Sequence, residues 1–228
     1  MSRAVPAAVL FDIDGTLITT GGAGAAAWDR AFRELYDVPA DIGHLTEAGM
    51  PDQEVLQVAF RRLIGREPSA TEVARLLAGY LEHLPRTVAE STRYVVQPGV
   101  RELLTRLSRA GELLGLTTGN VEAAAHIKLA RAELNRFFAF GGYGSDSPQR
   151  AELTRIAIAR ATTILGRQPR QVLVVGDTPR DIEAAHDAHA TAVGVATGDY
   201  TVQQLQDAGA DHVLHTFAGD AFPLDEHQ

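Results

Sequence analysis

The sequence predicts an α/β fold, a doubly wound, Rossmann-like parallel sheet with an inserted all-helical cap. Three features of the sequence point to this fold. Short, continuously apolar runs recur along the chain and each ends near a polar residue, as buried parallel strands do. Helical patterns lie between these runs. One long stretch near the N-terminus shows helical spacing without any apolar strand.

The expected strands and helices alternate along the chain. The apolar runs that predict strands are AAVLF (7–11), GELLGLTTG (111–119), QVLVVGD (171–177), TAVGVATG (191–198) and DHVLHTF (211–217). Helical spacing predicts helices in VRELLTRLSRAG (100–111), VEAAAHIKLARAEL (121–134), AELTRIAIARATTIL (151–165), DIEAAHDAHA (181–190) and TVQQLQDAG (201–209). This alternation is typical of a doubly wound parallel sheet.

Residues 18–97 interrupt the alternation. Helical spacing runs through GAAAWDRAFRELYD (24–37), DQEVLQVAFRRLIG (52–65) and ATEVARLLAGYLEHL (70–84). We therefore expect a core formed by residues 1–17 and 98–228 and a helical cap formed by 18–97. Trp28 should lie in the core of the cap, and its hinge should use the glycines Gly21, Gly22 and Gly24. The tail AFPLDEHQ (221–228) is expected to fray.

The composition excludes several classes of partner and chemistry. With 21 Lys and Arg against 29 Asp and Glu, the formal net charge is −8, so no general basic field can hold nucleic acid or an anionic membrane surface. The 228 residues include no Cys, which excludes disulfides and leaves oxygen and imidazole as metal ligands. No apolar run approaches a membrane span and no convincing signal peptide is present, so we expect a soluble cytoplasmic protein.

Polar residues follow three of the expected strands where each strand ends: Asp12 with Asp14, Thr118, and Asp177. In a doubly wound sheet the ligand lies beyond the carboxyl ends of the strands, so these side chains should meet at one rim. Acids gathered at one place disfavour each other's ionisation unless a cation compensates. Asp12, Asp14 and Asp177, with Asp181 one helical turn later, have the oxygen ligands that Mg²⁺ prefers, and we expect them to bind it.

Asp12 and Asp14 are predicted to divide the chemistry between them. If the cation also binds a phosphate, the Asp12 carboxylate can attack phosphorus and form an aspartyl-phosphate. Asp14 would protonate the leaving oxygen and later activate the hydrolytic water. Gly15 lets the backbone turn sharply and expose amides to the anion, and Thr16 adds a hydroxyl.

A second phosphate-binding group is expected after the strand at 111–119. Thr118, Gly119 and Asn120 open the following helix and offer a hydroxyl and backbone N–H groups. Taken alone, each of these motifs could be a helix cap or a solvated strand end. Their joint occurrence, each at the end of a strand, favours phosphate chemistry.

FDIDGTL, LTTGN and VVGDTPRD resemble motifs I, II and IV of the haloacid dehalogenase (HAD) superfamily in order and spacing, over essentially the whole chain. The helical stretch falls where that superfamily carries its helical cap. PGVRELLTRL and ADHVLHTF also look like phosphoglycolate-phosphatase-like members. The resemblance implies a Mg²⁺-dependent phosphatase with Asp12 as nucleophile, Asp14 as acid and base, and Asp177 as metal ligand. Its substrate would be a small phosphorylated metabolite, with phosphoglycolate as first candidate, and we expect a monomer or a homodimer.

One position departs from the superfamily pattern. The resemblance implies a lysine at the start of the helix that precedes QVLVVGD, where it would hold the phosphate and neutralise the nucleophile. The single lysine of this chain, Lys128, lies on the helix after Thr118 instead. The matching position in SDSPQRAEL is Arg150, to which we assign the cationic, catalytic and substrate-binding role, because its forked donors can contact phosphate and carboxylate. Lys128 is the fallback.

Other activities stay open at this point. A 2-haloacid dehalogenase would share the Asp nucleophile, but dehalogenases typically carry a different residue at the position of Asp14. A Schiff-base phosphonate hydrolase would need a cap lysine, and residues 18–97 contain none. A response-regulator-type switch would be shorter and would lack the helical insertion. A non-catalytic phosphate-binding or partner-binding protein of the same fold could carry Arg150 in place of lysine.

Other polar residues have simpler explanations. His186 and His189 share one helix, but without a third nearby ligand we interpret them as exposed helix residues. A charged face on a cap helix explains the arginines Arg61, Arg62 and Arg66. His44 and Glu47 are candidate contacts of the cap.

Overall fold

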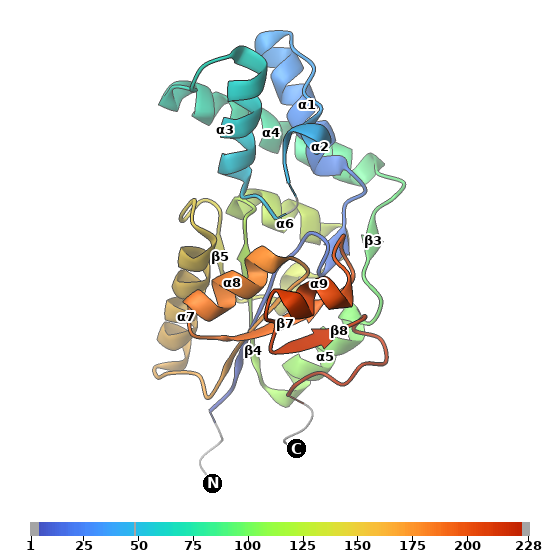
Figure 1. The fold of residues 1–228 in the computed structure, drawn as a ribbon, viewed down its shortest axis with the longest axis vertical. Helices are drawn as coiled ribbons and strands as arrows, with labels where there is room; N and C mark the ends of the chain where they lie inside the picture. Colours follow the sequence, from blue (N-terminus) through green and yellow to red (C-terminus); the bar gives the residue numbers. More distant parts are fainter. Residues whose placement is uncertain (1–4, 48, 225–228) are drawn as a thin grey trace.

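A central sheet of six parallel strands organises the computed structural model, which describes residues 5–47 and 49–224 (Figure 1). The strand order is β5-β4-β1-β6-β7-β8, and all neighbours pair in parallel. The strands are β1 (Ala8–Phe11), β4 (Leu113–Thr118), β5 (Phe140–Tyr143), β6 (Val172–Gly176), β7 (Thr191–Val195) and β8 (His212–Leu214). The predicted α/β doubly wound fold is confirmed. β5 was not predicted, because two glycines interrupt its apolar pattern.

Helices cover both faces of the sheet. Alternate residues of β1 point to opposite faces: Val9 and Phe11 belong to one hydrophobic cluster and Ala8 and Leu10 to another. The first cluster includes residues of α5 (Val100–Ala110) and α6 (Glu122–Ala130). The second includes residues of α7 (Arg150–Leu165), α8 (Pro179–Asp187) and α9 (Val202–Asp207). Burial on both faces explains why the strand sequences are continuously apolar.

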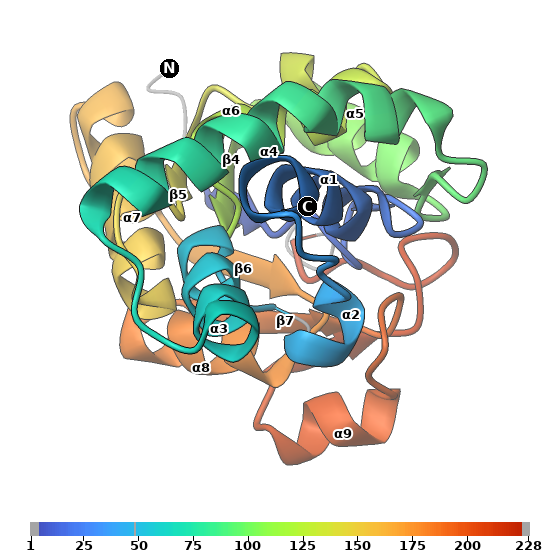
Figure 2. The same cartoon turned by 90° about the horizontal axis from the view of Figure 1, so that it is seen from above.

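The insertion forms a helical layer over the carboxyl edge of the sheet, on the side away from the chain ends (Figures 1 and 2). Its helices are α1 (Ala23–Tyr36), α2 (Ile42–Leu45), α3 (Asp52–Ile64) and α4 (Ala70–Glu90). Trp28 is buried, as predicted, and stacks on Tyr80 with ring centroids 4.1 Å apart. The cap's hydrophobic cluster continues into Val121 and Ala124 at the start of α6. The cap therefore packs directly on the core beside the strand ends.

The two ends of the insertion form a short sheet that the sequence did not predict. β2 (Ile18–Thr19) pairs antiparallel with β3 (Val95–Val96). Gly21 and Gly22 follow β2 with φ angles of +63° and +89°, whereas Gly24 lies inside α1; whether these glycines act as a hinge or form a static turn stays a prediction. The boundaries of the cap at 18 and 97 stay a prediction.

The C-terminal tail differs from the expectation in the part that the structure describes. Phe222 and Leu224 are buried and belong to the hydrophobic cluster under α5, so this part of the tail is packed rather than frayed. Its apolar side chains therefore form part of the hydrophobic cluster that also contains residues of β1 and α5. Residues 225–228 of the predicted frayed segment lie outside the described residues. Among the described helices, none combines the length and apolarity needed to cross a membrane.

Candidate active site

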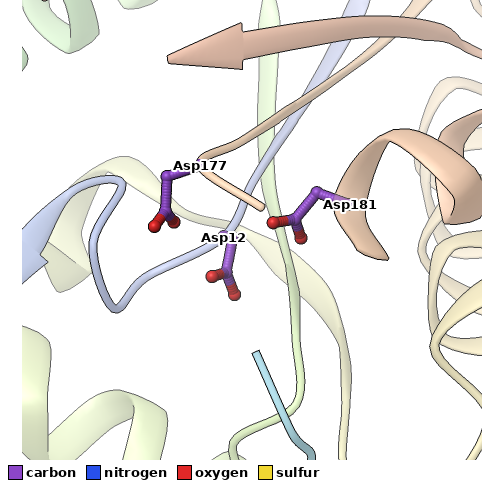
Figure 3. A group of neighbouring side chains, drawn as sticks. All are labelled: Asp12, Asp177 and Asp181. Atoms are coloured by element: carbon purple, nitrogen blue, oxygen red, sulfur yellow. The ribbon is translucent and has the colours of Figure 1, made fainter. Parts of the chain in front are cut away.

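Three buried carboxylates converge at the carboxyl edge of the sheet (Figure 3). Asp12 follows β1, Asp177 follows β6, and Asp181 lies in the first turn of α8. One carboxylate oxygen from each lies within 4.8 Å of the others. β1 and β6 are neighbours with Phe11 opposite Val175, so the strand pairing itself places the first two acids side by side.

Hydrogen bonds at the start of α8 fix the orientation of the Asp181 side chain. Both the backbone N–H and the hydroxyl of Thr178 donate to Asp181 Oδ2, at 3.0 and 2.7 Å. Pro179 occupies the first helical position, where a missing N–H costs nothing. The sequence DTPRD therefore begins a helix and holds its second acid against the strand ends at the same time.

Gly15 and Thr16 both pack against Asp177. Gly15 has φ +85°, and a Cβ built there would lie 2.2 Å from Asp177 Oδ2. The Gly15 N–H donates to the carbonyl of Ile18 at 2.8 Å, so it is already used. The buried Thr16 hydroxyl donates to Asp177 Oδ1 at 2.8 Å. The turn after β1 thus makes room for Asp177 and orients it, and the substrate-binding role of Gly15 and Thr16 stays a prediction.

Arg150, the first residue of α7, spans the acidic cluster and the cap. Its Nη2 lies 3.1 Å from Asp12 Oδ1 and also contacts Asp181 Oδ1, while Nη1 donates to the carbonyl of Gly49 at 2.9 Å. Burial lowers the pKa of the guanidinium, but Asp181 and Asp12 reverse this effect and raise it above its usual value. Arg150 is therefore a fixed positive charge, and its forked geometry serves three partners at once.

The acidic cluster carries more negative charge than Arg150 can balance. Burial raises the pKa of Asp12, with Arg150 opposing and Asp181 and Asp14 adding to the rise. Burial also raises the pKa of Asp177, as do Asp181 and Asp12. Such shifts show that the acids disfavour each other's ionisation. A hard divalent cation with oxygen ligands fits this donor set, because it would neutralise the excess charge.

The Asp14 carboxylate lies outside the acidic cluster of Asp12, Asp177 and Asp181. It belongs to a second cluster, formed with Lys128 and Asn120. Its Oδ2 accepts from Lys128 Nζ at 2.6 Å and from Asn120 Nδ2 at 2.8 Å. β1 ends at Phe11, so Asp12 and Asp14 lie beyond the regular strand, just before the turn at 15–17, and the strand rule for side chains two residues apart does not apply. The Asp14 side chain thus lies with Lys128 and Asn120 and outside the group of three acids, and its role as a metal ligand stays a prediction.

Asn120 connects Asp14 to the end of β4. Its amide oxygen accepts from Lys128 Nζ at 2.5 Å, and its Nδ2 donates to Thr118 Oγ1 at 2.8 Å as well as to Asp14. Thr118 is buried, and its hydroxyl oxygen also accepts from the Asn120 backbone N–H at 3.3 Å. Since both of these contacts use the oxygen as acceptor, the hydroxyl hydrogen is left to donate elsewhere.

Lys128 is the site residue that sequence reasoning treated only as a fallback. It is 6% exposed and lies among the buried residues of α6, with Ala124, Ala125 and Leu129. Burial lowers the pKa of Lys128, but Asp14 and Asp52 more than offset this and raise it. A lone lysine on the apolar face of a predicted helix was the available signal, because a buried ammonium needs partners.

Asp12 of the acidic cluster and the Asp14, Asn120 and Lys128 cluster line one small cavity of about 180 Å³ between core and cap. The core contributes Asp12, Asp14, Thr118, Asn120, Lys128 and Arg150. Helices of the cap and the loop before α3 supply the opposite wall. The volume is below the roughly 300–1,000 Å³ of pockets for drug-sized ligands, so the site accepts a small molecule.

The start of α3 docks the cap onto the loop after β4. The Asp52 N–H donates to the Gly119 carbonyl at 2.9 Å, and the Val121 N–H donates to Asp52 Oδ2 at 2.8 Å. Gly119 permits this approach, since a Cβ there would lie 2.8 Å from Pro51 Cα. Burial raises the pKa of Asp52 to about 6, with Lys128 and the Val121 N–H opposing. The cap thus closes over the cavity through hydrogen bonds to the phosphate-binding loop predicted from Thr118, Gly119 and Asn120.

The remaining residues singled out in the sequence lie outside the cavity lining. His186 contacts Asp211 at 3.2 Å, and His189 is exposed with φ +56°. Arg61 pairs with Glu67 and Arg66 with Glu72 on the exposed cap surface, where Arg62 also lies. His44 contacts Asp41, and Glu47 lies 3.4 Å from Arg180 of α8. Glu47 is therefore a contact between cap and core.

Comparison with known proteins extends along nearly the whole chain. The family model described as haloacid dehalogenase-like hydrolase matches residues 6–189. The probable phosphatase IndB of Dickeya dadantii is 29% identical and covers 92% of this chain and 90% of its own. A phosphoglycolate phosphatase of Pseudomonas putida is 32% identical over 85% of this chain and 71% of its own. The crystal structure of a hydrolase from Pseudomonas syringae superposes with a TM-score of 0.72 at 25% identity, covering 98% and 99% of the two chains.

Proposed function

This chain belongs to the haloacid dehalogenase-like hydrolase family and is a phosphoric monoester hydrolase, and we propose that it uses Mg²⁺ and a phosphorylated Asp12 to hydrolyse a small phosphate ester. One observation carries the proposal. Asp12 belongs to the acidic cluster and also lines the cavity. A nucleophilic carboxylate at that position faces the substrate and a cation site together.

The chain's own residues supply attack and phosphate binding. Asp12 would attack phosphorus and release the alcohol, and water would then cleave the acyl-phosphate and regenerate the carboxylate. Thr118 would donate its remaining hydroxyl hydrogen to a phosphate oxygen, next to the backbone N–H of Gly119 in the loop before α6. Arg150 would oppose the charge of Asp12 and of the phosphate.

Asp14 would move the protons. It would protonate the leaving oxygen in the first step and accept a proton from the attacking water in the second. Lys128 and Asn120 would hold its Oδ2 in place. This arrangement favours a phosphatase over a dehalogenase, since displacement of halide needs no acid at this position.

The cation would be held by the carboxylates of Asp12, Asp177 and Asp181. Mg²⁺ bound there would neutralise the excess negative charge of these acids and of the phosphate oxygens. The small cavity supports a small phosphorylated metabolite as substrate, and the similarity to phosphoglycolate phosphatases makes phosphoglycolate one ester to test. A cytoplasmic location and a monomeric or homodimeric state stay predictions.

Phosphate release tests the proposal. The purified protein should release phosphate from a panel of phosphorylated metabolites with Mg²⁺, should lose this activity with EDTA, and should regain it when Mg²⁺ is restored. Asp12→Asn should abolish turnover with an unchanged circular dichroism spectrum. The exposed Asp187→Asn on α8 is the matched control and should retain activity. Turnover by Asp12→Asn at the wild-type rate would exclude Asp12 as the nucleophile.

A further inference from the structure

The cap side of the cavity has an unusual balance of charge. Its larger side chains are Trp28, Ile42, Met50, Asp52, Val55 and Tyr80. Within the described residues, this wall offers one carboxylate and no lysine, arginine or histidine. The arginines of the cap for which ion pairs are seen lie on its outer surface, as in the Arg30–Glu90 and Arg86–Glu90 pairs. The group that leaves the phosphate would therefore meet an apolar wall with a single acid in it.

Asp52 is held rigidly in that wall. It is 7% exposed, accepts from the Val121 N–H at 2.8 Å, and lies against the Tyr80 hydroxyl, whose pKa is raised first by burial and then by the charge of Asp52 and its hydrogen bond with that acid. A carboxylate has about four acceptor sites, and these two donors occupy two of them. The remaining acceptor capacity of Asp52 is available to a ligand in the cavity, which the side chain lines.

The cations on the core side are already engaged. Lys128 contacts Asp14 and Asn120, and Arg150 contacts Asp12 and Asp181. Each is paired with at least one carboxylate, so the region around the leaving group carries no surplus positive charge. A substrate carboxylate that lay against Asp52 would add a like charge beside a buried acid, since Asp52 is only 7% exposed, and like charges at close range disfavour each other's ionisation.

We propose that Asp52 selects the leaving group, so that the site takes phosphate esters of small alcohols bearing a hydroxyl or ammonium donor and disfavours those bearing a carboxylate. This inference rests on the proposed phosphatase function. A hydroxyl or ammonium group would donate to Asp52, whereas a carboxylate would leave Asp52 without that bond and add repulsion. Phosphoglycolate, the first candidate from resemblance, falls in the disfavoured class.

Three esters of nearly equal size test this selection: 2-hydroxyethyl phosphate, phosphoethanolamine and phosphoglycolate. We expect kcat/KM of the wild-type protein to be at least about tenfold higher for the first two than for the third. Asp52→Asn keeps an oxygen for the Val121 N–H but removes the charge, and should raise the value for phosphoglycolate until the preference nearly disappears. Asp41→Asn, an exposed acid-to-amide change in the cap, should leave the preference unchanged. Equal or better turnover of phosphoglycolate by the wild-type protein, or an unchanged preference in Asp52→Asn, would overturn the inference.

Binding separates this inference from the proposed function. Calorimetric titration of Asp12→Asn with the three esters in Mg²⁺ measures the preference without turnover. The two donor-bearing esters should bind more tightly than phosphoglycolate. If the wild-type protein releases no phosphate but this order of binding holds, the proposed function fails and the leaving-group preference stands. Tighter binding of phosphoglycolate, or no binding of any of the three esters, overturns the preference.

Discussion

Two buried cations, Arg150 and Lys128, line the same cavity. Each defines one half of the site, and the surroundings of the two cations differ. Arg150 lies against Asp12 and Asp181, with Asp177 close by. Lys128 lies against Asp14 and shares it with the neutral Asn120. Around Arg150 the acids outnumber the cation, whereas the contact between Lys128 and Asp14 joins one cation to one acid. The first half is incomplete without a further positive charge, whereas in the second Lys128 is hydrogen-bonded to one acid, Asp14, and Asp52 is a second acid close enough to help raise its pKa after burial lowers it.

This difference in charge indicates that the two halves have different roles, one in binding a cation and the other in orienting a carboxylate. An excess of buried negative charge destabilises the folded protein. A bound divalent cation would offset this destabilisation. A balanced pair has no need for an added ion, and its hydrogen bonds can fix one carboxylate in a chosen direction. We infer that the Arg150 half holds the metal and the nucleophile, and that the Lys128 half positions the proton-transfer group.

The largest expected effect comes from breaking the acidic half at Asp177. Asp177→Asn removes a metal ligand and should lower kcat/KM by at least about 10²–10³-fold, a loss typical of removing a preorganised electrostatic group. Mg²⁺ should raise the melting temperature of the wild-type protein, because a ligand that binds the folded state stabilises it. The variant should lose most of this shift in calorimetry. A full Mg²⁺-dependent shift in Asp177→Asn would contradict the metal assignment.

The second prediction concerns the forked guanidinium of Arg150, in the same half of the site. Arg150→Met leaves Asp12 and Asp181 buried without their partner, and should lower the free energy of unfolding by about 3–5 kcal/mol in denaturant titrations. Arg150→Lys keeps the charge but cannot reproduce the forked contacts, so its loss should be smaller. Mg²⁺ should restore part of the stability of Arg150→Met. Equal stability of the two variants would show that charge at this position has little importance.

Lys128 should behave differently, because the acid to which it is hydrogen-bonded, Asp14, is partly open to water. Lys128→Met should lower kcat by about 10–100-fold through loss of Asp14 orientation. Its effect on unfolding should be smaller than that of Arg150→Met, since the Asp14 side chain is 39% exposed and water can solvate it. The Mg²⁺-dependent melting shift should persist. Loss of that shift in Lys128→Met would mean that the two halves are not separate.

The smallest effect is expected at Arg180, a cation at the surface with a side chain 35% exposed, which joins the core to the cap through Glu47 and Glu54 at 3.4 and 3.3 Å. Exposed ion pairs contribute about 0–1 kcal/mol, so Arg180→Ala should change the free energy of unfolding by less than 1 kcal/mol. KM should rise modestly with kcat retained, if these pairs hold the cap closed. A loss of stability as large as that of Arg150→Met would remove the distinction between buried and exposed cations.

Local patterns in the sequence were sufficient to predict most strands of the sheet and the acids at its edge. Continuous apolar runs predicted β1, β4, β6, β7 and β8, because strands buried on both faces leave that pattern. Asp12 and Asp177 come directly after two of these runs, and the strand register brings them together. The position of Arg150 came from resemblance, and the structure puts its guanidinium against Asp12.

Only the tertiary structure decided where side chains in the turns and on the helix faces point. Asp14 turns away from the acidic cluster because the strand has already ended, and the Gly15 amide is used inside that turn. Lys128 enters the site because the cap and α6 bury the face of the helix that carries it. Asp52, about 70 residues before Val121 in the chain, becomes part of the cavity only when α3 docks on the loop after β4. The sequence determined which chemical groups were available at the strand ends, and the packing of cap on core determined how they are paired, because long-range contacts leave no periodic signal in the sequence.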